Sequence, residues 1–254
     1  MFSTPRQAEI LRLVREERNC AIVDLASRLE VSDETIRRNI KPLIAEGLLI
    51  KVHGGVMLPE RLDEPPFQRR MVASLEGKRA IGACIAELVR DGDSLILEGG
   101  TTCLRVAEAL AARSRLTVVT NSIEVARVLT SRNGNRVFIA GGELRADDSA
   151  AFGDSVLAFL RQFHVRYAIV SVTAIDLQGR FMDALPADAA FAQAAFSQAE
   201  RRVVAADHAK VGHSALVHAF GADGVDLLVT DEAPPPALAQ VLAAADVEVI
   251  GPVR

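Results

Sequence analysis

Residues suited to binding an anion stand together in the segment Glu98-Gly99-Gly100-Thr101-Thr102, which follows the apolar run 94–97 and precedes a helical stretch. Two glycines allow a ligand to approach the backbone closely. Free N–H groups and the dipole at the start of a helix favour a negative charge. This order of residues predicts a site for a small phosphorylated molecule.

Three further polar clusters follow predicted strands: 120–122, 141–145 and 207–210. Ligands of open parallel sheets bind at the carboxyl ends of the strands, so all four clusters are expected at one edge. Lys210 would supply positive charge, and polar side chains beside it would hold hydroxyl groups. Each cluster alone is also an ordinary strand-to-helix connection or helix cap. The candidate effector-binding residues are Glu98, Gly100, Thr101, Thr102, Asn121, Ser122, Gly142, Glu143, Arg145, Asp207 and Lys210.

A second group of residues is suited to contact DNA. A helix over 22–29, a very short turn at Glu30-Val31 and a helix capped by Ser32 form a helix-turn-helix pattern, whose second helix would lie in the major groove. Isoleucines and leucines occupy one side of that helix, and cationic residues the other. A strand over 48–52 and a turn at 53–55 would add a wing. The candidate DNA-binding residues are Ser32, Thr35, Arg37, Arg38, Lys41, Lys51 and His53.

The same periodicity would also suit a small helical bundle with solvated arginines. A polar outer face on a helix is usually just a hydrated face. Periodicity by itself therefore leaves both interpretations open.

The elements that position these residues fall into two domains. Residues 1–56 are predicted to form the helix-turn-helix domain, with a first helix over 5–18, and residues 57–66, with three prolines, a linker. Residues 67–254 alternate strands and helices, which predicts an α/β domain with a mainly parallel sheet. Strands are expected at 94–97, 116–119, 136–140, 167–172, 202–206, 226–229 and 247–250, and helices at 75–90, 102–113, 122–131, 152–162, 187–199 and 235–244.

Composition excludes several classes of protein. The chain has 254 residues and a net charge of −4, so overall charge gives no sign of nucleic-acid binding. Its three cysteines are widely spaced and show no metal-ligand pattern, so no metal or other cofactor is expected. No apolar run approaches the ~20 residues of a membrane span, and no signal-peptide pattern opens the chain. These features predict a cytoplasmic protein.

The segments 31–40, 46–49 and 52–55 resemble the DeoR family of bacterial regulators, and so do Gly100-Thr101-Thr102, 118–122, 141–145, Gly153 and 207–210. The resemblance implies a winged helix-turn-helix facing operator DNA. It also implies a sensor domain similar to the ribose-5-phosphate isomerase and CoA-transferase fold, which binds phosphorylated sugars or polyols as inducers. Segments 173–183 and 205–212 are most similar to the branch of glycerol-3-phosphate repressors.

The chain departs from the family pattern at several positions. Pro42 stands inside the third helix and should kink it. Glu98 replaces an aspartate and should crowd the pocket floor, and Gly77 replaces an acid before Lys78. Asp188 stands where the family has a glutamate, and it follows an unexpected proline, Pro186.

The resulting hypothesis is a dimeric or tetrameric repressor of a carbohydrate or polyol operon, released from DNA by a phosphorylated effector. The main alternative is a sugar-phosphate isomerase with an added helical domain, for which Glu98, Glu143 and Asp207 would be the candidate carboxylates. Such an isomerase needs a base over the substrate carbon, and sequence places no carboxylate pair there. A third possibility is a metabolite-binding module without DNA contact.

Overall fold

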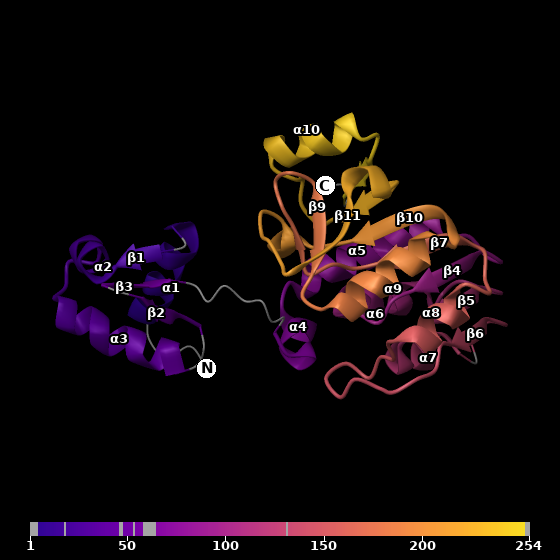
Figure 1. Ribbon diagram of the computed structural model, residues 1–254, viewed down its shortest axis with the longest axis horizontal. Coiled ribbons are helices and arrows are strands. Elements are labelled where there is room, and N and C mark those ends of the chain that lie inside the picture. Colours follow the sequence, from indigo (N-terminus) through magenta and orange to yellow (C-terminus); the bar gives the residue numbers. More distant parts are fainter. Residues whose placement is uncertain are drawn as a thin grey trace. The chain divides into compact units, whose positions relative to one another are not determined.

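The chain folds as two compact units, residues 1–61 and 62–254, which are described separately (Figure 1). A computed structural model describes residues 5–17, 19–45, 48–52, 54–57, 65–130 and 132–251. Within these ranges no helix is long and apolar enough to cross a membrane. The predicted linker falls largely outside the described residues, so its boundaries stay a prediction.

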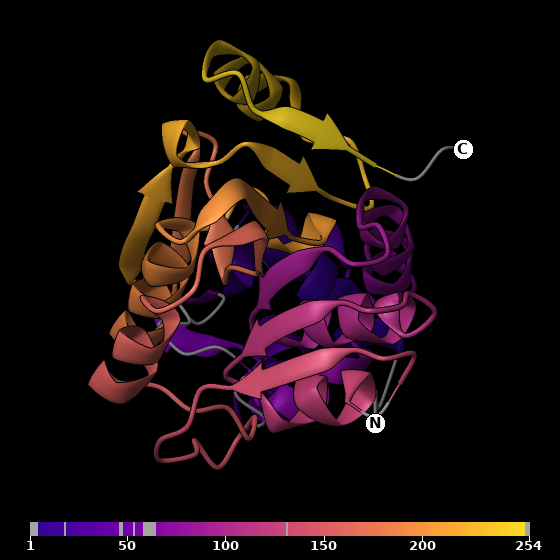
Figure 2. The same cartoon turned by 90° about the vertical axis from the view of Figure 1, so that its right-hand side faces the viewer.

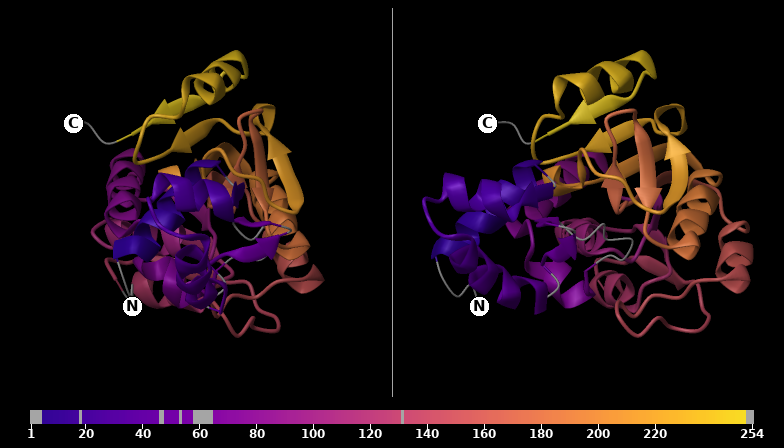
Figure 3. Two further views of the ribbon diagram at one scale, coloured as in Figure 1. Left: turned by 90° about the vertical axis from the view of Figure 1, so that its left-hand side faces the viewer. Right: turned by 60° about the vertical axis from the view of Figure 1, so that its left-hand side comes forward.

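The described residues of the first unit, at the indigo end of the colour bar in Figure 3, form three helices and a small antiparallel sheet with strand order β1-β3-β2. Its core is apolar, with Ile10, Ile36 and Leu49 fully buried. The predicted helices and hairpin are present, whereas β1 was not predicted because three residues are too short to show alternation. The elements are α1 (Pro5–Glu17), β1 (Asn19–Ala21), α2 (Ile22–Arg28), α3 (Asp33–Ala45), β2 (Ile50–Val52) and β3 (Gly55–Met57).

Helix α3 continues from Asp33 to Ala45 with Pro42 inside it. Proline lacks the N–H that a regular helix would donate to the carbonyl four residues earlier. Pro42 is exposed, so water can satisfy the carbonyl of Arg38. The proline therefore does not end the helix.

The second unit is built on a seven-stranded parallel sheet in the order β13-β12-β10-β7-β4-β5-β6. Figure 2 shows these strands side by side, with the yellow β13 at one edge. All seven predicted strands are present, with ends shifted by up to three residues. The strands are β4 (Ser94–Leu97), β5 (Thr117–Thr120), β6 (Arg136–Ile139), β7 (Val165–Val170), β10 (Ala199–Ala205), β12 (Leu227–Val229) and β13 (Glu248–Ile250).

Helices cover both faces of this sheet. Successive residues of β4 point to opposite faces, so Ile96 belongs to one apolar cluster and Leu95 and Leu97 to the other. A strand buried on both faces reads as a continuous apolar run, which explains why the inner strands β4, β5, β7 and β12 were predictable. One face packs against α5 (Leu75–Leu88), α6 (Thr101–Leu110) and α7 (Ile123–Leu129), and the other against α8 (Asp154–Leu160), α9 (Pro186–Phe196) and α10 (Pro236–Ala244).

Several elements of the second unit were not predicted. They are α4 (Phe67–Val72), the 3₁₀ turns η1 (His208–Lys210) and η2 (Ala222–Gly224), and an antiparallel sheet of β8 (Ala174–Ile175), β9 (Arg180–Asp183) and β11 (Val217–Gly221) in the order β11-β9-β8. These segments are short and are interrupted by glycine or polar residues. Such segments contain too few residues to show the hydrophobic periodicity of a helix or a strand.

The strand order places a switch point beside β4. From β4 the chain moves outward through β5 and β6, then returns to β7 on the other side of β4. In open α/β sheets the crevice beyond the strand ends at such a point binds ligands. The strand order therefore predicts a ligand site at the loops that follow β4 and β7.

Close packing of α5 against α6 depends on Gly82. A Cβ atom at this position would lie 2.7 Å from the backbone oxygen of Arg105. We expect Gly82→Ala to lower the free energy of unfolding by about 1–3 kcal/mol, because the two helices must separate. Gly141 has no atom within 4 Å of such a Cβ and no positive φ, so Gly141→Ala is the matched control and should cost little. Equal destabilisation of both variants in urea unfolding would contradict this packing argument.

Candidate functional site

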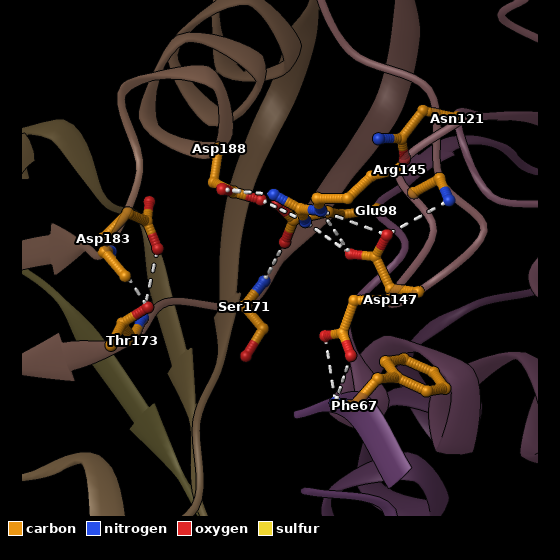
Figure 4. A network of polar contacts seen from close by, with 12 residues as sticks. Phe67, Glu98, Asn121, Arg145, Asp147, Ser171, Thr173, Asp183 and Asp188 are labelled. Carbon is orange, nitrogen blue, oxygen red and sulfur yellow. Dashed lines mark hydrogen bonds and ion pairs between the residues drawn. The ribbon is translucent and has the colours of Figure 1, made fainter. Parts of the chain in front are cut away.

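A pocket opens at the switch point, between the loops that follow β4 and β7. Its empty volume is about 450 Å³, including its open mouth. Both charged and hydroxyl side chains line it (Figure 4). The lining residues are Arg70, Glu98, Gly99, Gly100, Thr101, Thr102, Arg145, Asp148, Phe152, Ser171, Val172, Thr173, Asp183, Asp188 and Lys210.

The loop after β4 forms the floor of the pocket. A Cβ on Gly99 would lie 2.9 Å from the Cβ of Ser122, so only glycine fits there without a shift. Gly100 is the N-cap of α6, and Thr101 and Thr102 begin the helix. Amides in the first turn of a helix have no acceptor within the helix. The floor is therefore suited to hold an anion once another group orients it.

Glu98 lines the pocket, and crowding of the floor by its longer side chain stays a prediction. Its side chain is 5% exposed, and its Oε2 accepts a hydrogen bond of 2.8 Å from the backbone N–H of Ser171. The additional methylene lets the carboxylate reach the neighbouring strand. Glu98 thus ties the ends of β4 and β7 together.

Arg145 is the centre of an ion-pair cluster in the pocket wall. Its guanidinium donates to Asp188 at 2.8 and 2.9 Å and also pairs with Asp148, as Figure 4 shows for Asp188. It lies over the ring of Phe152 at 4.2 Å. Burial opposes the charged form, but the hydrogen bonds to Asp188 and Asp148 raise the pKa of Arg145 overall. Two carboxylates therefore already compensate this cation.

The structure brings six of the eleven predicted effector residues into the pocket wall: Glu98, Gly100, Thr101, Thr102, Arg145 and Lys210. These six come from three of the four predicted clusters. Lys210 belongs to η1, and Thr101 to the start of α6. Residues far apart in the chain thus meet at the predicted edge of the sheet.

The other five predicted residues lie outside the pocket wall, and three of them have local structural roles. Asn121 is buried and donates to the carbonyl of Ala151 at 3.0 Å. The hydroxyl of Ser122 caps α7, and the carboxylate of Asp207 caps η1. Gly142 and Glu143 are exposed. The strand-end rule located the edge correctly, but it does not distinguish caps from lining residues.

Sequence reasoning missed several lining residues, above all Arg70, Asp148, Ser171 and Thr173. Thr173 follows the predicted strand 167–172, so the rule applied to the four clusters would have found it. Ser171 falls inside that predicted strand, because β7 ends two residues earlier than expected, at Val170. Arg70 comes from α4, which no periodicity predicted. Its position in the pocket wall is determined by the tertiary packing of α4 and not by a local sequence pattern.

Lys78 is a buried cation beside the floor. It is 2% exposed, and its ammonium donates to the hydroxyl of Thr101 at 3.1 Å and to the carbonyl of Arg70 at 2.6 Å. It therefore adds positive charge close to the start of α6. It also joins that helix to α4.

The turn η1 is held by an ion pair between His208 and Asp231. The ring Nδ1 lies 2.7 Å from Asp231 Oδ2, and the His208 amide donates to the same carboxylate at 2.7 Å. A Cβ on Gly77 would lie 2.1 Å from Asp231 Oδ2. The glycine, which stands where the family has an acidic residue, therefore leaves room for the carboxylate of Asp231. His208, Asp231 and Glu232 have ligand atoms within 4.8 Å of one another, a spacing that could hold a metal ion. His208 is hydrogen-bonded to Asp231, and its Nδ1 lies 3.6 Å from Glu232 Oε1.

In the first unit, α3 exposes the predicted cations. Arg37, Arg38 and Lys41 are exposed, whereas Ile36 and Ile40 on the other side are buried. The hydroxyl of Ser32 accepts from the amide of Thr35 at 3.3 Å and lies 2.9 Å from its hydroxyl, so both residues help to begin the helix. Lys51 is exposed on β2, and His53 lies outside the described residues.

Two family models match this chain. The DeoR-like helix-turn-helix domain matches residues 6–61, and the DeoR C-terminal sensor domain matches residues 73–232. The HTH-type transcriptional repressor CsqR of Escherichia coli K12 is 34% identical over 99% of this chain and 97% of its own length. The glycerol-3-phosphate regulon repressor of the same organism is 32% identical over 95% of this chain and 96% of its own length.

Solved structures give a weaker likeness. Ribose 5-phosphate isomerase A from Methanocaldococcus jannaschii is 14% identical, covers 55% of each chain and has a TM-score of 0.41.

Removing the Arg145 cation should destabilise the second unit. Arg145→Met would leave Asp148, which is 4% exposed, without its partner, and breaking such a pair costs about 3 kcal/mol. Arg127 forms the same i,i+3 type of pair with Glu124 but is 71% exposed, so Arg127→Met should cost less than about 1 kcal/mol. Unfolding in urea measures both. Similar losses would show that the Arg145 cluster is no more than a surface pair.

The His208–Asp231 pair should make stability depend on pH. The hydrogen bond to Asp231 raises the pKa of His208, against the opposing effect of burial. The stabilisation is therefore fully present below the pKa of histidine in the unfolded chain, near 6.5. It is lost as the pH rises through the raised value of the folded protein. NMR titration should show the His208 pKa falling towards its ordinary value in Asp231→Asn, and an unchanged titration would refute the pairing.

Proposed function

The chain belongs to the DeoR family of transcriptional regulators, and we propose that it represses a carbohydrate or polyol operon and is released from operator DNA by a phosphorylated effector. The observation that carries this proposal is the separation of two sites on two units. A cationic helix surface suits the DNA groove, and a polar pocket at a sheet switch point suits a small metabolite. We expect the protein to act in the cytoplasm, where bacterial DNA lies.

The surface of α3 supports the DNA half of the proposal. Arginine can bind a guanine edge with two hydrogen bonds, and lysine and hydroxyl side chains can bind phosphates. Arg37, Arg38 and Lys41 are exposed on the side opposite the core. A homodimer or homotetramer would present two such helices to two half-sites of an operator.

The pocket supports a ligand with one anionic end and several hydroxyl groups. The amides at the start of α6, together with Arg70 and Lys210, would face the phosphate. The carboxylates of Asp148 and Asp183, on the same wall, would accept hydrogen bonds from hydroxyls. Relatives of this chain include glycerol-3-phosphate regulon repressors, so glycerol 3-phosphate is the effector that we propose first.

The positions of three carboxylates favour a regulator over a sugar-phosphate isomerase. Glu98 accepts from the Ser171 amide, Asp207 caps η1, and Glu143 is exposed outside the pocket wall. Isomerisation would require a base over a substrate carbon, and these local roles count against all three carboxylates for it. Turnover of ribose 5-phosphate would support the enzyme instead.

DNA binding by the full chain tests the proposal directly. A fragment from upstream of its own gene should bind with an affinity that falls steeply as salt increases. Arg38→Ala should lose about 1–3 kcal/mol of binding free energy, whereas Arg161→Ala, at an exposed position after α8, should lose little. Glycerol 3-phosphate should weaken binding by roughly 5–150-fold. Binding that ignores both salt and Arg38 would contradict the proposal.

A further inference from the structure

Helix α4 is the first helix of the second unit, and the chain from the first unit enters it through Pro65 and Pro66. Contacts of two side chains hold its start. The carboxylate of Asp147 accepts the Phe67 amide at 3.0 and 3.1 Å, as Figure 4 shows. The Nε of Arg70 donates to the Pro65 carbonyl at 2.8 Å, and its Nη2 lies 3.5 Å from Asp147.

Both side chains are connected to the pocket. The side chain of Arg70 is only 12% exposed and lines the pocket wall. Asp147 stands between Arg145 and Asp148, which form the ion pair of the same wall. A tight turn fixes this loop, because the Ser149 amide donates to the Arg145 carbonyl at 3.0 Å. A change in the pocket therefore has a short path to the start of α4.

A second connection runs through Lys78. Its buried ammonium bonds both the Arg70 carbonyl and the Thr101 hydroxyl. Thr101 is the first residue of α6, where the anion is proposed to bind. The backbone of α4 is thus bonded to the floor of the pocket by one intervening side chain.

We propose that Arg70 and Asp147 couple the pocket to the connection between the two units, an inference that rests on the proposed binding of a phosphorylated effector. A phosphate at the start of α6 competes with Asp147 and the Pro65 carbonyl for the Arg70 guanidinium, because charged pairs of this kind are strong. When Arg70 turns to the anion, the first turn of α4 loses two of its fixed contacts. The ligand then has different affinities for the two arrangements, which is the condition for any regulatory shift.

Two substitutions test the coupling, and Asp147→Asn separates it from ligand binding, because Asp147 is not among the residues that line the pocket. Asp147→Asn keeps an oxygen for the Phe67 amide but removes the charge that pairs with Arg70. Arg70→Lys keeps the charge but lacks the planar fork that reaches Pro65 and Asp147 together. Glu200→Gln is the matched control, because its carboxylate is 61% exposed on β10. All variants are made in the full chain.

The first measurement is the ratio of DNA dissociation constants with and without glycerol 3-phosphate. We expect a ratio of roughly tenfold or more in the native protein and the control, and a ratio near one in Asp147→Asn and Arg70→Lys. In Asp147→Asn the rise in Tm on adding glycerol 3-phosphate should persist. Unchanged ratios in both variants would overturn the coupling, whereas a ratio of one already in the native protein would contradict the proposed function.

The second measurement needs no DNA. Amide hydrogen exchange is followed in the full chain with and without inorganic phosphate. Coupling predicts altered exchange both at residues 101–104 and at residues 67–72. A change confined to 101–104 would overturn the coupling alone, and no change at either segment would contradict the anion site as well.

Discussion

Compensation of charge in a confined space determines how this pocket can work. Its wall contains the cations Arg70, Arg145 and Lys210, and the carboxylates of Glu98, Asp148, Asp183 and Asp188. Taking such charges away from water is costly unless they are paired. Arg145 is bound by two carboxylates, and Glu98 accepts a hydrogen bond from a backbone amide. Both side chains therefore help to hold the pocket wall together. An added anion would meet Arg70, Lys210 and the amides at the start of α6, which are the groups that we propose to face it.

This arrangement also explains how much of the site could be predicted. The inner strands β4, β5, β7 and β12 are largely buried, so their apolar runs were visible in the sequence, and the strand-end rule then pointed to the edge where the pocket lies. The same rule does not say which polar residues at that edge cap helices, as Ser122 and Asp207 do. Arg70 and Asp183 reach the pocket from α4 and β9, whose short segments show no period. Their positions follow from tertiary packing alone.

The departures from the family pattern show how a local change is absorbed by its surroundings. Glu98 is longer than the expected aspartate but reaches the Ser171 amide and remains buried. Gly77 lacks the expected acid, and the carboxylate of Asp231 lies against it while holding His208. Pro42 sits at an exposed position of α3, where a lost backbone hydrogen bond can be replaced by water. In the first two cases a hydrogen bond involves the changed position or its neighbour, and in the third the helix continues past the proline.

The central claim is that this pocket recognises the charge of its ligand and not only its hydroxyl groups. Isothermal titration of the full chain with glycerol 3-phosphate and with glycerol compares two ligands that differ by the phosphate. We predict measurable binding of glycerol 3-phosphate, weakened when Lys210 is replaced by methionine, and no binding of glycerol at the same concentrations. Equal affinity for the two compounds would contradict the account.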